Sequence, residues 1–345
     1  MLTSLEKFEK PATMGVTILT SVIPLAVVGA LLYAAFFVKA SALVVAVKPP
    51  AIERRDLFMG VAMPADKVIW AAGSNGKVVR SDDGGTKWLA QLVPTAANLQ
   101  GIAAWSVDQA VAVGGDNAVI RTSDAGRTWK EVSVPKSEVA NKLLNVRAYE
   151  NGVAWAVGEM GAVLRTKDFG QNWERALAEK DQAWNDVSFS GGHGILVGEF
   201  GRTMKTADSG VTWQAVDSGI KSSLMSVTLR DAENGVAVGL SGAVLVTHDG
   251  GSHWSPVERQ TIEHLNNVIW DGEHWIAVGD KGVIVTGDMA GVTWKAARVS
   301  EGNLGWNTQI LRFNSSGKSK GYLLAGASLS RLEGGSLTVL GHAAD

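Results

Sequence analysis

A short motif returns six times along the chain at nearly constant spacing. It reads Ser or Thr, any residue, Asp, any residue, Gly, two further residues and Trp, and its first copy runs from Ser81 to Trp88. Successive motif tryptophans are 41, 44, 40, 41 and 40 residues apart. A repeat of roughly 20–50 residues is typical of solenoids and propellers. The sequence therefore predicts similar units that each pack on the next.

We call this motif the Asp box. Its aspartates and tryptophans are Asp83, Asp124, Asp168, Asp208, Asp249, Asp288, Trp88, Trp129, Trp173, Trp213, Trp254 and Trp294. An Asp at a hairpin tip accepts backbone N–H groups in an Asx-turn, and Gly two residues later adopts positive φ without steric cost. The Trp can bury a large area in the gap to the next blade. We interpret the boxes as structural fasteners and not as catalytic carboxylates.

Each unit also contains short strand-like segments separated by turn residues. In the third unit they include 144–146, 155–158 and 162–166, and a further segment follows each box. A seventh unit at 321–335 keeps the glycines and lacks the Trp. Four short strands per unit describe a propeller blade. We predict an all-β, seven-bladed β-propeller with four-stranded blades over residues 57–345.

The first forty residues have a different composition. No charged residue occurs from Pro11 to Val38, and about 20 apolar residues suffice for a helix to cross a bilayer. Pro24 is tolerated in such a helix. Ala40-Ser41-Ala42 resembles a signal-peptide cleavage site, but the apolar run exceeds the roughly 7–15 residues of a signal peptide. The predicted organisation is a tail at 1–12, a transmembrane helix at 13–38, a linker at 39–56 and the propeller at 57–345.

Charge and cysteine content exclude several classes of function. The formal net charge of −2 lacks the basic footprint of a nucleic-acid-binding protein. The chain has no cysteine, which excludes disulfides, thiolate metal sites and a cysteine nucleophile. The histidines show no metal-ligand spacing. We expect no cofactor, no metal and no small-molecule substrate.

The pattern Val-Gly-x-x-Gly-x-x-Leu-Arg-Thr-x-Asp-x-Gly-x-x-Trp, complete at 157–173, resembles the Asp-box (BNR repeat) propellers of the photosystem II stability/assembly factor family. The resemblance covers about residues 57–335. It implies a non-catalytic, extracytoplasmic propeller that holds a membrane protein during assembly or in its finished complex. The chain lacks the lipobox cysteine of the photosynthetic members and has the apolar segment instead. Relatives of this kind in proteobacteria look like accessory subunits of RND/MMPL-type exporters.

The resemblance implies an integral membrane protein or complex as partner, with the propeller in the periplasm and the helix in a bacterial inner membrane. The positively charged residues on the propeller side of the helix favour the opposite orientation. Large domains, however, translocate largely regardless of charge. The missing cysteines suit an oxidising compartment. We therefore expect a periplasmic propeller.

Two sets of residues are candidates for partner binding. The position before the Ser or Thr of each box, here called the slot, holds a cation in the first four blades and Val in the next two. These residues are Arg80, Arg121, Arg165 and Lys205, followed by Val246 and Val285. The resemblance implies that such arginines form a basic patch for a client. The alternative is that each cation pairs with a carboxylate or lies along a Trp.

The second set comprises Met160, Phe200 and Leu240, apolar residues at three consecutive hairpin tips. Neighbouring exposed apolar groups suggest a contact surface, whereas isolated ones are common on any protein.

A carbohydrate-binding or sialidase-like glycosidase propeller is the alternative function. A sialidase-like site needs converging arginines, a Tyr/Glu pair and an acidic Asp. Tyr149 and Glu150 are adjacent, so on a strand they would point to opposite faces. Arginines converging on such a pair in the central cavity would favour this alternative. We expect no enzyme.

Overall fold

The computed structural model describes residues 14–37, 50–300, 302–314 and 320–341. The chain divides into two compact units, Met1–Pro49 and Pro50–Asp345. The second unit thus includes residues 50–56, which were predicted as the end of the linker.

The described part of the first unit is helix α1 (Met14–Phe37), which contains Pro24. It occupies the residues predicted as a transmembrane helix. Across the described residues, no helix combines the length and the apolarity needed to cross a membrane. The membrane-spanning role of this segment therefore stays a prediction. The predicted tail at 1–12 and residues 39–49 of the linker lie outside the described residues.

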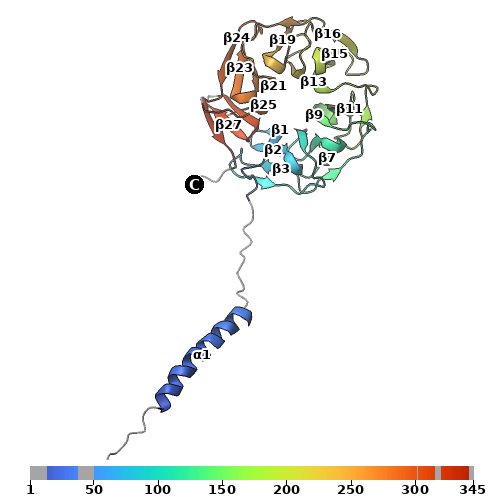
Figure 1. Ribbon diagram of the computed structural model, residues 1–345. Coiled ribbons are helices and arrows are strands. Elements are labelled where there is room, and N and C mark those ends of the chain that lie inside the picture. The colour runs from blue at the N-terminus through green and yellow to red at the C-terminus, as the bar shows by residue number, and fades with distance from the viewer. Residues whose placement is uncertain (1–13, 38–49, 301, 315–319, 342–345) are drawn as a thin grey trace, which may run out of the picture. The chain divides into compact units, whose positions relative to one another are not determined.

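The second unit is a seven-bladed β-propeller, which confirms the predicted fold (Figure 1). Each blade is an antiparallel sheet of four strands that are consecutive in sequence. The first three blades contain β1 (Phe58–Ala65), β2 (Val68–Gly73), β3 (Val78–Ser81), β4 (Leu89–Ala90), β5 (Leu99–Ala104), β6 (Ala110–Gly114), β7 (Val119–Thr122), β8 (Lys130–Glu131), β9 (Leu143–Ala148), β10 (Ala154–Gly158), β11 (Val163–Thr166) and β12 (Glu174–Arg175).

Blades 4 and 5 contain β13 (Trp184–Ser190), β14 (His193–Gly198), β15 (Arg202–Thr206), β16 (Gln214–Asp217), β17 (Leu224–Leu229), β18 (Gly235–Gly239), β19 (Val244–Thr247) and β20 (Ser255–Pro256). Blades 6 and 7 contain β21 (Leu265–Trp270), β22 (Trp275–Gly279), β23 (Val283–Gly287), β24 (Trp294–Arg298), β25 (Asn307–Asn314), β26 (Lys320–Gly326), β27 (Ser330–Glu333) and β28 (Ser336–Val339). Short 3-10 turns occur at η1 (Ser74–Gly76), η2 (Gly115–Asn117), η3 (Glu150–Gly152), η4 (Glu199–Gly201), η5 (Leu240–Gly242) and η6 (Asp280–Gly282).

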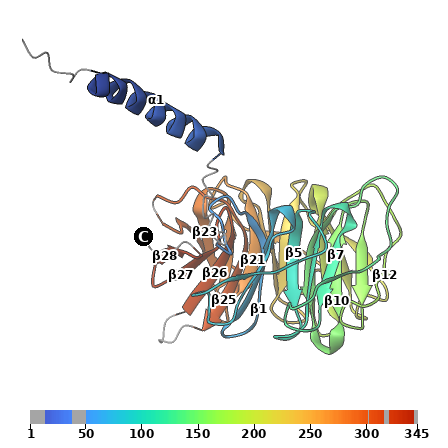
Figure 2. The same cartoon turned by 90° about the horizontal axis from the view of Figure 1, so that it is seen from below.

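The strands run through the thickness of the ring, so the connections gather on two faces (Figure 2). The box face carries the Asp boxes, between the third and fourth strands, and the turns between the first and second strands. The loop face carries the turns between the second and third strands and the loops that join successive blades. Candidate residues can belong to one site only if they lie on the same face.

Close packing at the end of the second strand of each blade explains why glycine recurs there in the sequence. All five residues of β10 are buried. A Cβ at Gly158 would lie 2.2 Å from the carbonyl oxygen of Lys142, so only glycine lets β9 approach this closely. The equivalent glycines of the other blades end their second strands in the same way.

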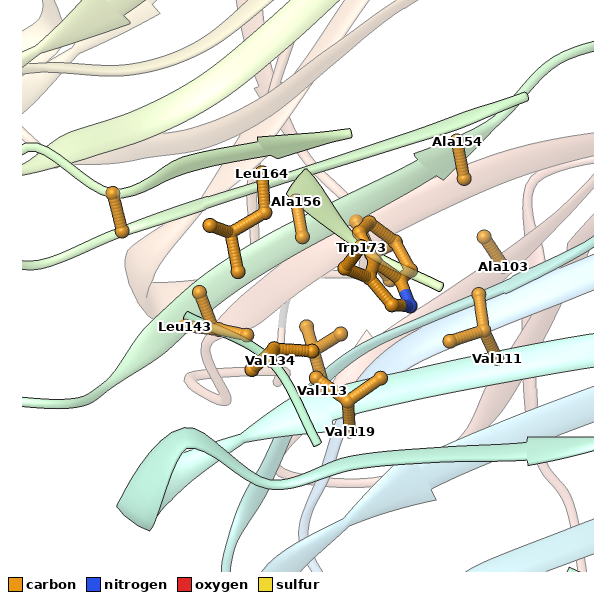
Figure 3. Close-up of a cluster of buried hydrophobic side chains, with 12 residues drawn as sticks. Ala103, Val111, Val113, Val119, Val134, Leu143, Ala154, Ala156, Leu164 and Trp173 are labelled. Carbon is orange, nitrogen blue, oxygen red and sulfur yellow. The ribbon is translucent and has the colours of Figure 1, made fainter. Parts of the chain in front are cut away.

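Apolar clusters fill the gaps between blades. In the cluster of Figure 3, Trp173 of the third box lies with Val111 and Val113 of β6 and Leu143 of β9. Trp173 is 9% exposed, and its indole N–H donates to Gly170 (3.2 Å). The box tryptophan therefore does fill an inter-blade gap. It packs toward the preceding blade, however, and not toward the next blade as predicted.

The seventh blade closes on the first through side chains, since no strand is exchanged between them. The N–H of Val61 donates to Gln309 (2.7 Å), and the Thr308 hydroxyl donates to the Met59 carbonyl (2.9 Å). Outside the sheets, Ile52 and Leu340 pack in one cluster.

Similar contacts join the inner strands elsewhere. The N–H of Val227 donates to Asp186 (3.0 Å), and that of Ile310 donates to Asn267 (3.0 Å). The residues at this third position of each inner strand are Gly60, Gly101, Asn145, Asp186, Ser226, Asn267 and Gln309. In several junctions a polar side chain thus extends the hydrogen bonding of one blade into the next.

Candidate protein-binding site

The slot cations mostly fasten one blade to the following blade. Arg121 donates from Nε to the carbonyl of Phe169 in the next box (3.2 Å). Lys205 donates to the Ser252 hydroxyl, also in the next box (2.6 Å). A cation in this position supplies the hydrogen bond that a box carbonyl or hydroxyl needs at the blade edge.

Arg80 is the most enclosed of the four predicted slot cations, at 7% exposure. It pairs with Asp82 (2.6 Å), donates to the Val107 carbonyl (2.7 Å) and lies 4.5 Å from the Trp70 ring centroid. Val246 occupies the slot of the fifth blade, where its methyl groups lie against Gly291 of the next box.

A fifth slot cation, Arg331, was missed in the sequence. It faces Leu323 in the register that Arg165 has with Trp155, and it donates to the Gly84 carbonyl of the first box. The seventh unit has no Asp box, so the alignment on boxes gave no slot there. The offset from the glycine that ends the second strand gives no guide either, because Arg331 lies five positions after Gly326 whereas Arg165 lies seven after Gly158.

The four slot cations sit on successive blades, and Arg80, Arg121 and Lys205 contact the following blade. The alternative of a carboxylate or Trp partner applies to Arg80, whereas Arg121 and Lys205 pair with a carbonyl and a hydroxyl. Their role in partner binding stays a prediction.

Arg165 has a different environment from these three. Its guanidinium donates to Glu174 on its own blade (2.9 and 2.6 Å) and lies 5.3 Å from the Trp155 ring centroid. Lys167 approaches the same carboxylate at 3.7 Å. The side chain of Glu174 is 58% exposed. Hydrogen bonds from Arg165 lower the pKa of the Glu174 carboxyl.

The first and third blades differ at the residue two positions after the slot. In the first blade it is Asp82, which pairs with Arg80, whereas in the third blade it is Lys167. The third blade thus presents two cations against one exposed carboxylate. A surface ion pair of this kind contributes little to stability, so Glu174 can be exchanged for another carboxylate.

Beside Arg165, a groove of about 600 Å³ opens on the box face between blades 3 and 4. Tyr149, Trp155 and Phe189 form its aromatic wall. Arg165 and Lys167 also line the groove, together with one exposed carboxylate, Glu150. Trp155 and Phe189 stack with ring centroids 5.0 Å apart, and Tyr149 meets Phe189 edge-on at 5.6 Å.

The aromatic wall is held in place by the backbone. The Phe189 N–H donates to the Tyr149 hydroxyl (3.1 Å). Burial raises the pKa of Tyr149 to about 12, so this phenol stays protonated at neutral pH. The groove combines a fixed apolar wall with two cations at its rim, which suits a carboxylate next to an apolar side chain.

The three predicted tip residues lie on the opposite, loop face. Phe200 is 67% exposed, while Met160 and Leu240 are half-buried. The structure therefore does not bring the tips and the slot cations into one site.

The central cavity has about 200 Å³. Its lining is Met59, Gln100, Leu144, Asn145, Asn185, Met225, Ser226, Asn266, Asn267, Thr308 and Gln309. This part of the cavity has no arginine, tyrosine or carboxylate among its described lining residues. A second part, of about 380 Å³ toward the box face, is lined by all seven inner strands and includes Arg147, Tyr149 and Arg312, but not Glu150. Arg147 pairs with Asp186 (2.5 Å). Arginines converging on the Tyr149/Glu150 pair, the arrangement that would favour a sialidase-like site, are therefore not found in the described cavity.

Over the part of the chain that the structure describes, no three His, Asp or Glu side chains are grouped to hold a metal ion. The two histidines beside the fifth box have other contacts. His248 contacts Asn234 (2.8 Å), and His253 contacts Asp249 (2.6 Å).

The fold places the chain in the class of Asp-box propellers, and its candidate site is a binding groove. A family model described as "Photosynthesis system II assembly factor YCF48" matches residues 86–183, 126–223, 177–261 and 211–317. These matches together cover more than half of the chain. The chain therefore belongs to this family.

Solved structures agree on the fold. "YCF48 bound to D1 peptide" is 16% identical, with a TM-score of 0.65, covering 81% of this chain and 93% of that one. "YCF48 from Cyanidioschyzon merolae" is also 16% identical, with a TM-score of 0.64 and coverages of 83% and 96%. The WD40 β-propeller domain of Doa1 is 9% identical, with a TM-score of 0.65 and coverages of 83% and 95%. The comparison with curated proteins gives no match.

Proposed function

We propose that this chain is a non-catalytic propeller that binds a client protein through the groove between blades 3 and 4. A carboxylate of the client replaces Glu174 on Arg165 and Lys167, and an adjacent apolar side chain lies against the aromatic wall. The observation that carries the proposal is the pair of cations that share one exposed carboxylate beside a preformed groove. Family membership supports an assembly role, and one solved structure of the family is titled as bound to a peptide.

The proposal includes the setting of the client. The uncharged segment from Pro11 to Val38 anchors the chain in a bacterial inner membrane, and the propeller lies in the periplasm. The client is an integral membrane protein that this chain stabilises or helps to assemble. An RND/MMPL-type exporter, with this chain as accessory subunit, is the first client to test. The support for these points is the sequence alone.

Co-purification from native membranes tests the groove. In Arg165→Glu, Lys167→Glu, both cations at the rim become carboxylates, and we expect loss of the client. The control is Lys130→Glu, Lys295→Glu, which makes the same change of charge at exposed strand positions. Full retention of the client by the groove variant, with unchanged folding, would place the binding surface elsewhere.

A second variant separates binding from general charge effects. Glu174→Gln removes the internal carboxylate and leaves both cations free. We expect client affinity to rise by roughly twofold to fivefold, since an exposed ion pair is worth about 0.5–1 kcal/mol. The measurement is a titration of the full chain in detergent with the purified client. An affinity that falls would show that Glu174 itself contacts the client.

A further inference from the structure

Exposed apolar side chains occur around the whole loop face. Four of them lie in loops that join successive blades, namely Leu92 (92% exposed), Val139 (77%), Ile262 (76%) and Leu304 (66%). Phe200 (67%) belongs to the turn η4 on the same face. Single exposed apolar residues are ordinary, and the box face also carries exposed Val107, Val211, Met289 and Val292, from three blades. The five on the loop face come from five different sectors of the ring.

Phe200 also has an unfavourable backbone conformation. Its φ is 56°, in the left-handed region that bulky residues rarely adopt. The equivalent positions of the other boxed blades have the same positive φ. They hold the polar residues Asn75, Asp116, Ser241 and Lys281 and, in blade 3, the half-buried Met160. An apolar ring held in a strained turn and left exposed indicates a contact outside the propeller.

The chain enters the propeller on this same face. The Ser74 N–H of the turn η1 donates to the Leu57 carbonyl (3.0 Å), and Lys77 pairs with Asp56 (2.7 Å). Twelve residues separate Phe37, the end of α1, from Pro50, a reach of at most about 45 Å. Whatever holds this end of α1 is therefore within about that distance of Pro50.

The side chains of α1 indicate what holds it. Those that the structure describes are exposed and uncharged, including Leu25 (73%), Leu31 (64%) and Phe36 (75%). Lipid is the medium in which such a surface is stable.

We propose that the loop face rests on the lipid surface of the membrane that holds α1, with its apolar side chains among the headgroups. This rests on the membrane anchoring in the proposed function, but not on α1 crossing the bilayer. A bilayer is flat and can meet all sectors of the ring together, whereas a protein client would meet one sector. Charges of both signs beside the apolar tips, such as Glu199 and Arg202 at Phe200, suit the headgroup layer.

The absence of cysteine from the chain makes single-cysteine probes unambiguous. We would place a fluorophore at Leu92→Cys or Ile262→Cys on the loop face, and at Val211→Cys or Val292→Cys as equally exposed controls on the box face. A further probe at Leu25→Cys reports on α1. The labelled full-length chain is reconstituted in phosphatidylethanolamine–phosphatidylglycerol vesicles with a quencher on the lipid headgroup or on the acyl chain.

The headgroup quencher should reduce fluorescence at Leu92 and Ile262 and leave Val211 and Val292 unchanged. The acyl-chain quencher should reduce it at Leu25. Quenching at Leu25 without quenching at the loop face would overturn this inference and leave the anchoring intact. Equal quenching on both faces would also overturn it. An unquenched probe at Leu25 would refute the membrane anchoring, and this inference with it.

Discussion

Asp124 shows how one side chain organises a hairpin tip. Its carboxylate accepts hydrogen bonds from the Thr122 hydroxyl (2.9 Å), the Thr128 N–H (2.9 Å) and the Thr128 hydroxyl (2.6 Å). The hydrogen bonds from Thr128 lower the pKa of Asp124 from 3.8 to about 2. Asp208 has the same contacts with Thr212 and also a pKa of about 2. The box aspartates therefore remain charged well into the acid range.

This lowering of the pKa has a defined effect on stability. Because the folded pKa lies below the unfolded value of 3.8, the stabilisation is complete above about pH 4 and is lost as the pH falls toward 2. As the pH falls toward 2, the double variant Asp124→Asn, Asp208→Asn should lose less stability than the chain without substitutions, because it lacks two of the carboxylates that titrate in this range. Urea unfolding midpoints measured between pH 5 and pH 2 decide the point. Identical pH profiles would mean that these carboxylates contribute nothing through their charge.

Trp173 gives a second prediction at this scale. Replacing it with Ala removes a ring that packs against Val111 and Val113, and should lower the free energy of unfolding by about 3–5 kcal/mol. The measurement is thermal unfolding of the variant. An unchanged melting temperature would show that the box tryptophans do not fasten the blades.

The sequence was informative about the box aspartates because each box contains both partners of their hydrogen bonds. It did not show which blade Trp173 packs against, because Val111 and Val113 come from another unit. The environment of Arg165 was not predictable in the same way. Its neighbour Glu174 is close in sequence, but Phe189, which completes the groove, comes from the next blade. Nothing in the spacing of the boxes predicts that Arg165 pairs with Glu174 on its own blade.

Among the elements, the inner strands depart most from the expected pattern. The register of β5 with β6 shifts between Leu99 and Gly101, and the other inner strands have similar irregularities at their starts. The bulged residues include Gln100, Asn185 and Asn266, which line the central cavity. Short apolar segments between turn residues predicted the strands, but an extra residue in one strand leaves no mark in a single sequence.

Two glycines test how closely the inner strands approach. A Cβ at Gly60 would lie 2.8 Å from the backbone nitrogen of Ile102 in the next blade, so Gly60→Ala should be destabilising. Gly115→Ala is the control, because the nearest atom to its Cβ is 3.9 Å away. Chemical denaturation of both variants is the measurement. Equal stability would show that the first two blades can separate without cost.

For the whole molecule, the seven-fold architecture followed from the repeat, while its boundaries did not. Ile52 was placed in the linker because the region before Phe58 contains no strand pattern. In the structure Ile52 is 5% exposed and packs with Leu340. Contacts between residues nearly three hundred positions apart cannot be read from local periodicity.

The boundary can be tested by truncation. Both 50–345 and 57–345 should fold as soluble monomers, because a closed ring leaves no long free sheet edge. The longer fragment should be more stable by about 1.5–3 kcal/mol, the value of one buried Ile side chain. Circular dichroism and thermal unfolding of the two fragments provide the comparison. Equal stability would mean that the packing of Ile52 is not needed.

Ring closure by side chains has a consequence for chain connectivity. Every blade uses four consecutive strands, and Ile52 lies against Gly341, so the two ends of the second unit meet at one junction. That junction resembles the other six apart from the missing peptide link. A circular permutant that joins residue 341 to residue 50 and opens the loop between β16 and β17 would keep every blade whole. The fold therefore does not require the ring to begin at the first blade. The starting blade is set by where the N-terminal segment joins the propeller.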